Sequence, residues 1–422
     1  MADQTASGTA HAPHLGRDDR EWLLSLFGTA VGAGILFLPL NAGAGGIWPL
    51  IFLTILIGPM TFLAHRGLSR VCLAQSKKEG DITDAVEEHF GPAMGTLITF
   101  GYFIAIFPIV MIYGISLTNI INEVITVQLG LGEPPRAIVS FFCVGILVAI
   151  MMGGSEVILK VTEIVVWPLL AVILGLSLYL IPQWSLDQFS EPFDIGTFLF
   201  TIVLTLPVLV FAFNHSPAVS TFVHYFRHNY GDRAEKLTSR VLFRNAALLT
   251  IFIMFFVFSC VLTMTPEEVD QAKALNLPIL TILAQSSDSA IFGWLAILVA
   301  FVAIVSSFFG HFMGAHEGLK GLVVEAIHSR SPGREINHRR LNLISALVIF
   351  LILWAIAYLN VSVMNLIEAL VAPILAIILF IMPVIAKWTV PAMKRFRSGW
   401  DPIVAGLGVV TIIGFVLTNF VL

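Results

Sequence analysis

Two apolar stretches of this chain are interrupted by helix-breaking residues, at Gly28-Thr29-Ala30-Val31-Gly32-Ala33-Gly34 and at Phe213-Asn214-His215-Ser216-Pro217. Glycine weakens a helix, and proline removes a backbone donor and disfavours the helical conformation of the residue before it. Each stretch is otherwise long enough to cross a membrane, where freed backbone groups must be satisfied by protein, water or ligand. Paired breaks of this kind predict a transporter whose substrate lies between them.

The composition places the chain in a lipid bilayer. It is 57% hydrophobic and only 12% charged, about half the charged share of soluble domains, and its mean hydropathy is +0.91. A soluble core of 422 residues cannot hide so much apolar surface, so lipid must solvate it. The cysteines at 72, 143 and 260 show neither metal-ligand spacing nor a disulfide framework, and they are interpreted as small hydrophobes.

Apolar runs of about 20 residues predict eleven membrane spans. Their approximate bounds are 22–45, 47–72, 94–125, 137–153, 160–181, 196–223, 241–264, 291–315, 341–359, 363–387 and 402–421. Residues 1–21 are polar, lack the features of a signal peptide and are expected to form a disordered cytoplasmic tail. The remainder, 22–422, is expected to be a single transporter domain without a separate soluble part.

The charges in the loops predict the orientation. With the N-terminus inside, the cytoplasmic loops and span ends hold all of the 23 lysines and arginines except Arg136 and Lys273. This distribution follows the positive-inside rule and predicts a cytoplasmic N-terminus and a periplasmic C-terminus.

The positions of the breaks predict an internal repeat. Five spans are an odd number, so a second set of five would be inverted, and each break falls in the first span of its set. Repeat one would cover about 22–182, repeat two about 196–387, and an extra helix about 402–421. Short surface helices are predicted to begin at Asp81 and, with proline at the first helical position, at Thr265.

The first break is a candidate site for a carboxylate. Its small residues leave backbone N–H and C=O groups bare, and a half-helix beginning near Ala33 would present free N–H groups and a partial positive charge. The alternative is close helix packing through the GxxxG pair formed by Gly28 and Gly32. The candidate substrate-binding residues here are Thr29, Ala30, Gly32, Ala33 and Gly34.

The second break adds polar side chains at mid-membrane. Released carbonyl groups near Phe213 could hold an amino group or a cation, and His215 could titrate near neutral pH and hand on a proton. A structural histidine bonded to a neighbouring carbonyl is the alternative. The candidate substrate-binding residues here are Phe213, Asn214, His215 and Ser216.

Coupling to a cation is a further expectation. Ser306 and Ser307 are adjacent hydroxyls that could complete an oxygen shell for sodium, although serines in membrane helices also bond carbonyls of their own helix. Glu368, before Pro373, is a candidate proton carrier, with a structural hydrogen bond as the alternative. The candidate cation-coupling residues are Gly28, Val31, Ser306, Ser307, His311 and Glu368.

Enzymatic motifs are not found. The chain carries no HExxH, G-x-S-x-G, P-loop or dinucleotide fingerprint, so we expect neither catalysis nor a cofactor. The basic clusters follow membrane topology and require no nucleic acid.

The motifs of this chain resemble those of a known family, the bacterial hydroxy/aromatic amino acid permeases, and within it the serine/threonine branch. The resemblance covers the chain from about residue 20 to its end. It is carried by the stretches 28–39, 59–68, 81–83, 86–91, 179–184, 213–217, 256–262 and 307–311.

The resemblance implies an eleven-span bacterial inner-membrane symporter with the five-plus-five inverted-repeat fold of the amino acid–polyamine–cation superfamily. Such proteins import L-serine or a close relative such as threonine or D-serine, driven by protons. An aromatic amino acid permease of the same family is the alternative, and a membrane amino acid sensor is a weaker one. The implied partners are an amino acid, a coupling cation and the bilayer.

One position departs from the branch. A lysine stands in the enteric serine permeases where this chain has Ser306. The pair Ser306-Ser307 is more similar to the hydroxyl pair of sodium-coupled members of the superfamily. The resemblance therefore leaves both H⁺ and Na⁺ open as the coupling ion.

Overall fold

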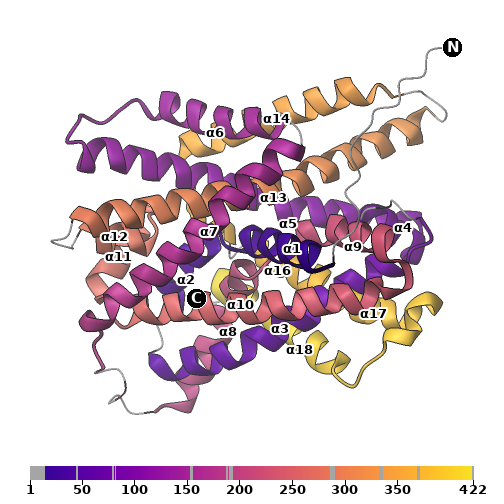
Figure 1. Ribbon diagram of the computed structural model, residues 1–422, viewed down its shortest axis with the longest axis horizontal. Helices are drawn as coiled ribbons and strands as arrows, with labels where there is room; N and C mark the ends of the chain where they lie inside the picture. The colour runs from indigo at the N-terminus through magenta and orange to yellow at the C-terminus, as the bar shows by residue number, and fades with distance from the viewer. Residues whose placement is uncertain are drawn as a thin grey trace.

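The protein is an all-helical bundle in which the long helices lie side by side, mostly along the horizontal axis of Figure 1. The computed structural model describes residues 15–43, 46–77, 80, 82–152, 155–186, 189, 193–285, 290–331, 336–367 and 371–420. Over these ranges no strand occurs. In the same ranges, nine helices are long and apolar enough to cross a membrane, or ten when one bent pair is counted as a span. The predicted all-helical, multi-span architecture is confirmed.

The bounds of the longer helices follow the predicted spans closely. They are α1 (Leu15–Ala30), α2 (Ala33–Ala42), α3 (Ile47–Ala74), α5 (Pro92–Glu123), α6 (Arg136–Met152), α7 (Ser155–Leu180), α8 (Ile195–Ala212), α9 (Ser216–Tyr230), α10 (Ala234–Val261), α13 (Ala290–Arg330), α14 (His338–Leu359) and α18 (Asp401–Phe420). The predicted span at 137–153 corresponds to α6, an apolar helix of 17 residues.

Shorter elements connect or continue these helices. They are α4 (Ile82–Phe90), α11 (Pro266–Leu275), α12 (Ile279–Gln285), α15 (Val363–Leu366), α16 (Ala372–Ala376) and α17 (Met382–Thr389), the π-helical turns η1 (Val124–Gln128) and η6 (Ile377–Ile381), and the 3₁₀ turns η2 (Ile181–Gln183), η4 (Gly231–Arg233) and η7 (Pro391–Phe396). The tenth predicted span is thus built from α15, α16, η6 and α17.

The two predicted surface helices are present. Asp81 lies outside the described residues, and α4 begins at the next residue, Ile82. At α11 the side chain of Thr265 accepts from the backbone N–H of Glu268, whose carboxylate accepts from the backbone N–H of Thr265. This capping box satisfies two N–H groups that the first helical turn leaves free.

Two predicted boundaries are wrong. Residues 1–21 were expected to form a disordered tail, but α1 begins at Leu15, because Asp18 and Asp19 are buried in contacts with α9 and α10.

The predicted spans 291–315 and 341–359 leave residues 316–340 between them as a loop, but α13 runs on to Arg330 and reaches 41 residues. The stretch contains no proline before Pro332, so nothing in it removes a backbone donor. Close packing also supports the extension, because a Cβ at Gly318 would lie 3.3 Å from the Cβ of Phe103 on α5.

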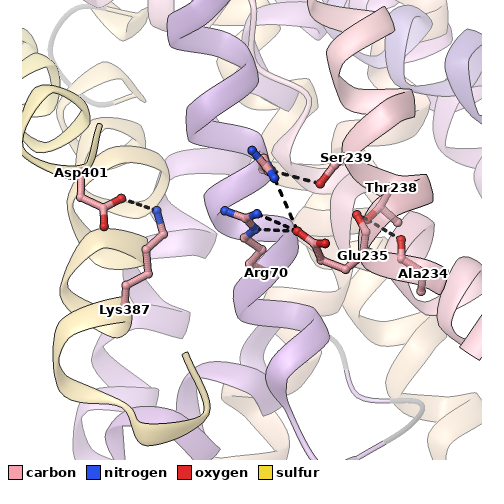
Figure 2. A network of polar contacts seen from close by, with 8 residues as sticks. Arg70, Ala234, Glu235, Thr238, Ser239, Lys387 and Asp401 are labelled. Atoms are coloured by element: carbon pink, nitrogen blue, oxygen red, sulfur yellow. Dashed lines mark hydrogen bonds and ion pairs between the residues drawn. The ribbon is translucent and has the colours of Figure 1, made fainter. Parts of the chain in front are cut away.

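Five positive charges form ion pairs with carboxylates of α1, α10 and α18, and α17, which carries one of them, lies on the right of Figure 1. We call the region of these charges the basic end and define it by Arg66, Arg70, Arg240, Arg244 and Lys387. Figure 2 shows Glu235 of α10 facing Arg70 of α3, at 2.7 Å between Oε1 and Nη2. The buried pair Lys387–Asp401, at 2.6 Å between Nζ and Oδ1, joins α17 to α18 in the same view.

The N-terminal half-helix α1 is attached to the same end. The carboxylate of Asp18 accepts a hydrogen bond from the hydroxyl of Tyr230 at 2.6 Å. Asp19 pairs with Arg240 and lies 3.4 Å from Nη1 of Arg244. Since Tyr230 is on α9 and both arginines are on α10, these contacts connect α1 to the segments that follow the second break.

Candidate functional site

The first predicted break is present. Helix α1 ends at Ala30, α2 begins at Ala33, and the two pieces are bent by 54°. At the bend Gly32 has an extended backbone, with φ −142° and ψ −153°. A Cβ at Gly32 would lie 2.5 Å from Oγ of Ser307 and 2.7 Å from the hydroxyl of Tyr113. Only glycine therefore lets α13 and α5 approach the break this closely.

The second predicted break is also present, where α8 ends at Ala212 and α9 begins at Ser216. Its freed N–H groups are satisfied by side chains as well as by backbone. The N–H of His215 donates to Nε2 of His65 at 3.2 Å, and the N–H of Ser216 donates to Oδ1 of Asn214 at 3.0 Å. The break is therefore a defined conformation and not a frayed helix end.

The two breaks are neighbours in space. A Cβ at Gly34 would lie 2.7 Å from Cα of Ala212 and 2.8 Å from a ring carbon of Phe211. The start of α2 therefore packs directly against the end of α8. Separated in sequence by almost half the chain, the two interruptions meet as the pattern predicts for a transporter.

The serine pair divides its contacts between two helices. Oγ of Ser307 donates to the carbonyl of Thr29 at 2.7 Å and lies 3.1 Å from the carbonyl of Gly28. Oγ of Ser306 donates within α13, to the carbonyl of Ala303 at 3.1 Å. The two hydroxyls thus differ. Ser307 bonds a carbonyl near the end of α1, whereas Ser306 bonds a carbonyl of its own helix, as serines in membrane helices often do.

His311 lies one turn further along α13. Its Nδ1 donates to the carbonyl of Ser307 at 2.9 Å, and its ring stands edge-on to Tyr113 with centroids 5.4 Å apart. Thr29, Ser307 and His311 are all buried, as is Val31. The structure therefore brings most candidate coupling residues to the first break, although no contact of Val31 with the hydroxyl pair is seen among the described residues.

Two candidates cannot be placed. Glu368 lies outside the described residues, and so does the side chain of Ala33, although its backbone begins α2. The proposed roles of both stay predictions.

A pair of stacked histidines occupies the second break. The rings of His65 and His215 are parallel within 6°, with centroids 3.6 Å apart. Nδ1 of His65 donates to the carbonyl of Thr61 at 2.9 Å, and Nδ1 of His215 donates to the carbonyl of Phe213 at 3.1 Å. Nε2 of His215 faces Nδ2 of Asn245 on α10 at 3.3 Å.

His65, Asn245 and Tyr113 were not among the predicted site residues. His65 carried a usable signal, because an ionisable residue inside an apolar span is a functional candidate by default. No sequence signal distinguishes Asn245 and Tyr113 from other polar residues in long apolar runs, because their partners are far away in the sequence.

Three polar atoms at the second break have no hydrogen-bond partner among the described residues: Nδ2 of Asn214, Oγ of Ser216 and Oδ1 of Asn245. All three side chains are buried, at 1% exposure or less. A buried polar group without a partner costs about 1–3 kcal/mol. Such groups therefore mark a place where a polar ligand is favoured.

A cavity of about 840 Å³ opens elsewhere, at the basic end. It is lined by Leu73, Arg227, His228, Gly231, Asp232, Ala234, Glu235, Arg395 and Phe396. None of these residues belongs to either break, so the cavity is separate from the candidate site.

Comparison with known proteins gives a consistent result. The model of the tryptophan/tyrosine permease family matches residues 23–421. The serine transporter SdaC of Escherichia coli K12 is 44% identical over 390 residues, covering 90% of each chain. SdaC of Shigella flexneri is 43% identical with the same coverage, and the threonine/serine transporter TdcC of Escherichia fergusonii is 36% identical over 99% of both chains.

Proposed function

Because the chain belongs to the tryptophan/tyrosine permease family, we propose that it imports L-serine or a related small hydroxy amino acid, with threonine and D-serine as further candidates. The similar proteins named above are serine and threonine/serine transporters, which favours this class over aromatic substrates. Import takes place by alternating access across a bacterial inner membrane. The basic end faces the cytoplasm, in accordance with the positive-inside rule.

The observation that carries the proposal is the meeting of two broken helices beside buried polar atoms without partners. Gly34 contacts Ala212 across the two breaks, and Nδ2 of Asn214 and Oγ of Ser216 are buried without a hydrogen-bond partner in the described ranges. A zwitterion supplies both a carboxylate and an ammonium group. Its carboxylate would accept from N–H groups at the amino end of α2, and its ammonium group would donate to carbonyls at the end of α8.

Symport with one cation supplies enough energy to accumulate the amino acid inside the cell. Each positive charge that enters gains about 2.3 kcal/mol per 100 mV, which corresponds to roughly fiftyfold accumulation at ~1.4 kcal/mol per tenfold. The carbonyls of Gly28 and Thr29 with Oγ of Ser307 form one candidate cation site. The histidine pair at the second break forms the other.

Counterflow tests the proposed function. Purified protein in liposomes loaded with unlabelled amino acid is expected to accumulate external radiolabelled L-serine. A panel of threonine, D-serine, tyrosine and tryptophan inside the vesicles then defines the substrate class. Absence of serine exchange, or exchange of tryptophan or tyrosine alone, contradicts the proposal.

A matched pair of variants tests the site. Ser216→Ala removes a buried hydroxyl at the break and is expected to lower the apparent serine affinity at least tenfold, in line with a lost polar contact of about 1.4 kcal/mol. Ser329→Ala removes an exposed hydroxyl near the end of α13, which bonds only its own helix in the described structure. The control is expected to keep the wild-type affinity.

A further inference from the structure

The hydrogen bonds at the second break fix where protons sit on the two stacked histidines. A carbonyl oxygen can only accept, so Nδ1 of His65, facing Thr61, and Nδ1 of His215, facing Phe213, both carry hydrogen. Nε2 of His65 accepts the backbone N–H of His215. Nε2 of His215 faces the amide nitrogen of Asn245, which donates. Both rings are therefore neutral in this arrangement.

An added proton could bind at Nε2 of His65 or at Nε2 of His215, and these two positions are not equivalent. A proton on Nε2 of His65 would set two donors against each other, because the backbone N–H of His215 already points there. The side chain of Asn214 also lies within hydrogen-bond reach of His65, but its Oδ1 already accepts the N–H of Ser216. A proton on His65 would therefore break the bond that holds the second break to α3. His65 is thus suited to remain neutral and to act as a positioning residue for the break.

A proton on Nε2 of His215 can be accommodated. It would face the amide of Asn245, and Oδ1 of that amide is buried without a partner among the described residues. Rotation of the amide group exchanges Nδ2 for Oδ1 and turns the donor that Asn245 presents into an acceptor. The added proton then has a hydrogen-bond partner, and the bond between His65 and the backbone of His215 is kept.

The pair can hold one proton but not two. The ring centroids are 3.6 Å apart, and two positive charges at that separation in a buried site repel strongly. The ionisable groups that act on His215 are His65 on α3 and His311 on α13. Asn245 on α10 is the neutral polar neighbour.

From this geometry we propose that Nε2 of His215 is the binding site of a co-transported proton, held by a rotated Asn245 and positioned by His65. The proposal rests on the function proposed above and selects the proton as its coupling ion. The charge appears at the second break, which packs against the amino end of α2, and it attracts the carboxylate that would bind there. By linkage, substrate and proton then strengthen each other's binding.

The experiment uses the full-length protein in liposomes that contain a pH indicator. Serine added outside is expected to acidify the lumen in wild-type vesicles, without a requirement for sodium. Asn245→Asp places a carboxylate against His215, and we expect the pH profile of serine uptake to move by about one pH unit or more toward higher pH. Asn245→Leu removes the acceptor at similar volume and is expected to flatten the profile.

A matched control is Asn229→Asp, because Asn229 bonds the carbonyl of Tyr225 on its own helix, at a distance from the break in sequence and structure. Its pH profile is expected to coincide with that of the wild type. Each profile is normalised to its own maximum, so a general loss of activity does not imitate the effect. If Asn245→Leu does not fold, the shift of the pH profile in Asn245→Asp and the proton flux of the wild type still test whether His215 binds the proton.

Two results would overturn the proton site while leaving the proposed function intact. One is serine counterflow together with sodium-dependent uptake that moves no protons. The other is a wild-type pH profile in well-folded Asn245→Asp and Asn245→Leu proteins. Failure of wild-type counterflow is a different outcome, since it overturns the proposed function and the proton site with it.

Discussion

Oγ of Ser307 on α13 lies 2.7 Å from the carbonyl oxygen of Thr29, one residue before α1 ends. The hydroxyl therefore donates to a carbonyl near the end of the half-helix, where the following turn no longer supplies a full set of backbone partners. Its neighbour Ser306 bonds Ala303 within α13. Two adjacent serines that look equivalent in the sequence thus have different roles in the structure.

The first prediction separates these two serines. Ser307→Ala is expected to cost about 1 kcal/mol of stability, because a buried hydrogen bond between α13 and α1 is lost, and to reduce serine uptake. Ser306→Ala is expected to change both properties much less. Thermal unfolding and serine uptake are the measurements, and equal effects of the two variants would contradict the different roles given to Ser306 and Ser307.

The second prediction concerns the contact between the breaks. Gly34→Val is expected to abolish transport, because even a Cβ at this position overlaps Cα of Ala212 at 2.7 Å, and backbone cannot move aside as a flexible side chain can. The control is Gly175→Val in α7, where nothing lies within 4 Å of the added Cβ in the described structure. Counterflow measures both variants. Wild-type transport by Gly34→Val would show that the breaks do not touch in the working protein.

The third prediction concerns the attachment of α1 to the basic end. Asp19→Asn removes the charge that Arg240 and Arg244 share. We expect faster hydrogen exchange of the backbone amides of α1, because the half-helix opens more often. Glu21→Gln is the matched control, since Glu21 pairs with Arg17 one turn away on the same exposed face. Equal exchange rates in the two variants would show that Asp19 does not hold α1.

The fourth prediction concerns pH and the junction of α3 with α4. Slight burial acts to raise the pKa of Glu88, but hydrogen bonds from the N–H and hydroxyl of Ser76 outweigh it and hold the pKa below its usual value. A lowered pKa means that the contact stabilises the junction above the pKa of an unfolded glutamate, about 4.3, and is lost as the pH falls through the lower folded value.

Exchange of the α4 amides should therefore rise as the pH falls below about 4, after correction for intrinsic exchange rates. Glu88→Gln cannot ionise and is expected to remove this pH dependence. If the acid response of the variant matches that of the wild type, another group is responsible.

The sequence allowed the bundle and both breaks to be predicted because their signals are local. Gly32 and Pro217 act on the backbone at their own positions, so the interruptions can be recognised without knowledge of the fold. The boundary at 316 was wrong because apolar length marks the part of a helix in lipid, whereas α13 continues into a charged stretch without a proline.

The histidine pair could not be predicted for a different reason. His65 and His215 are 150 residues apart, and Asn245 is another 30 residues further. Nothing in either local sequence indicates that one ring lies on the other. Only the packing of α3 against α9 brings the rings together, and the donor and acceptor pattern of the cluster follows from that packing.

The length of α13 has a mechanical consequence. Its 41 residues extend about 60 Å at ~1.5 Å per residue, roughly twice the thickness of the hydrocarbon layer. If α13 tilts by about 5° around its middle, each of its ends, ~30 Å away, moves by nearly 3 Å. A spin label near the end of α13 would therefore move further than the part of the helix where Ser307 contacts α1, so small tilts that begin at this contact become measurable.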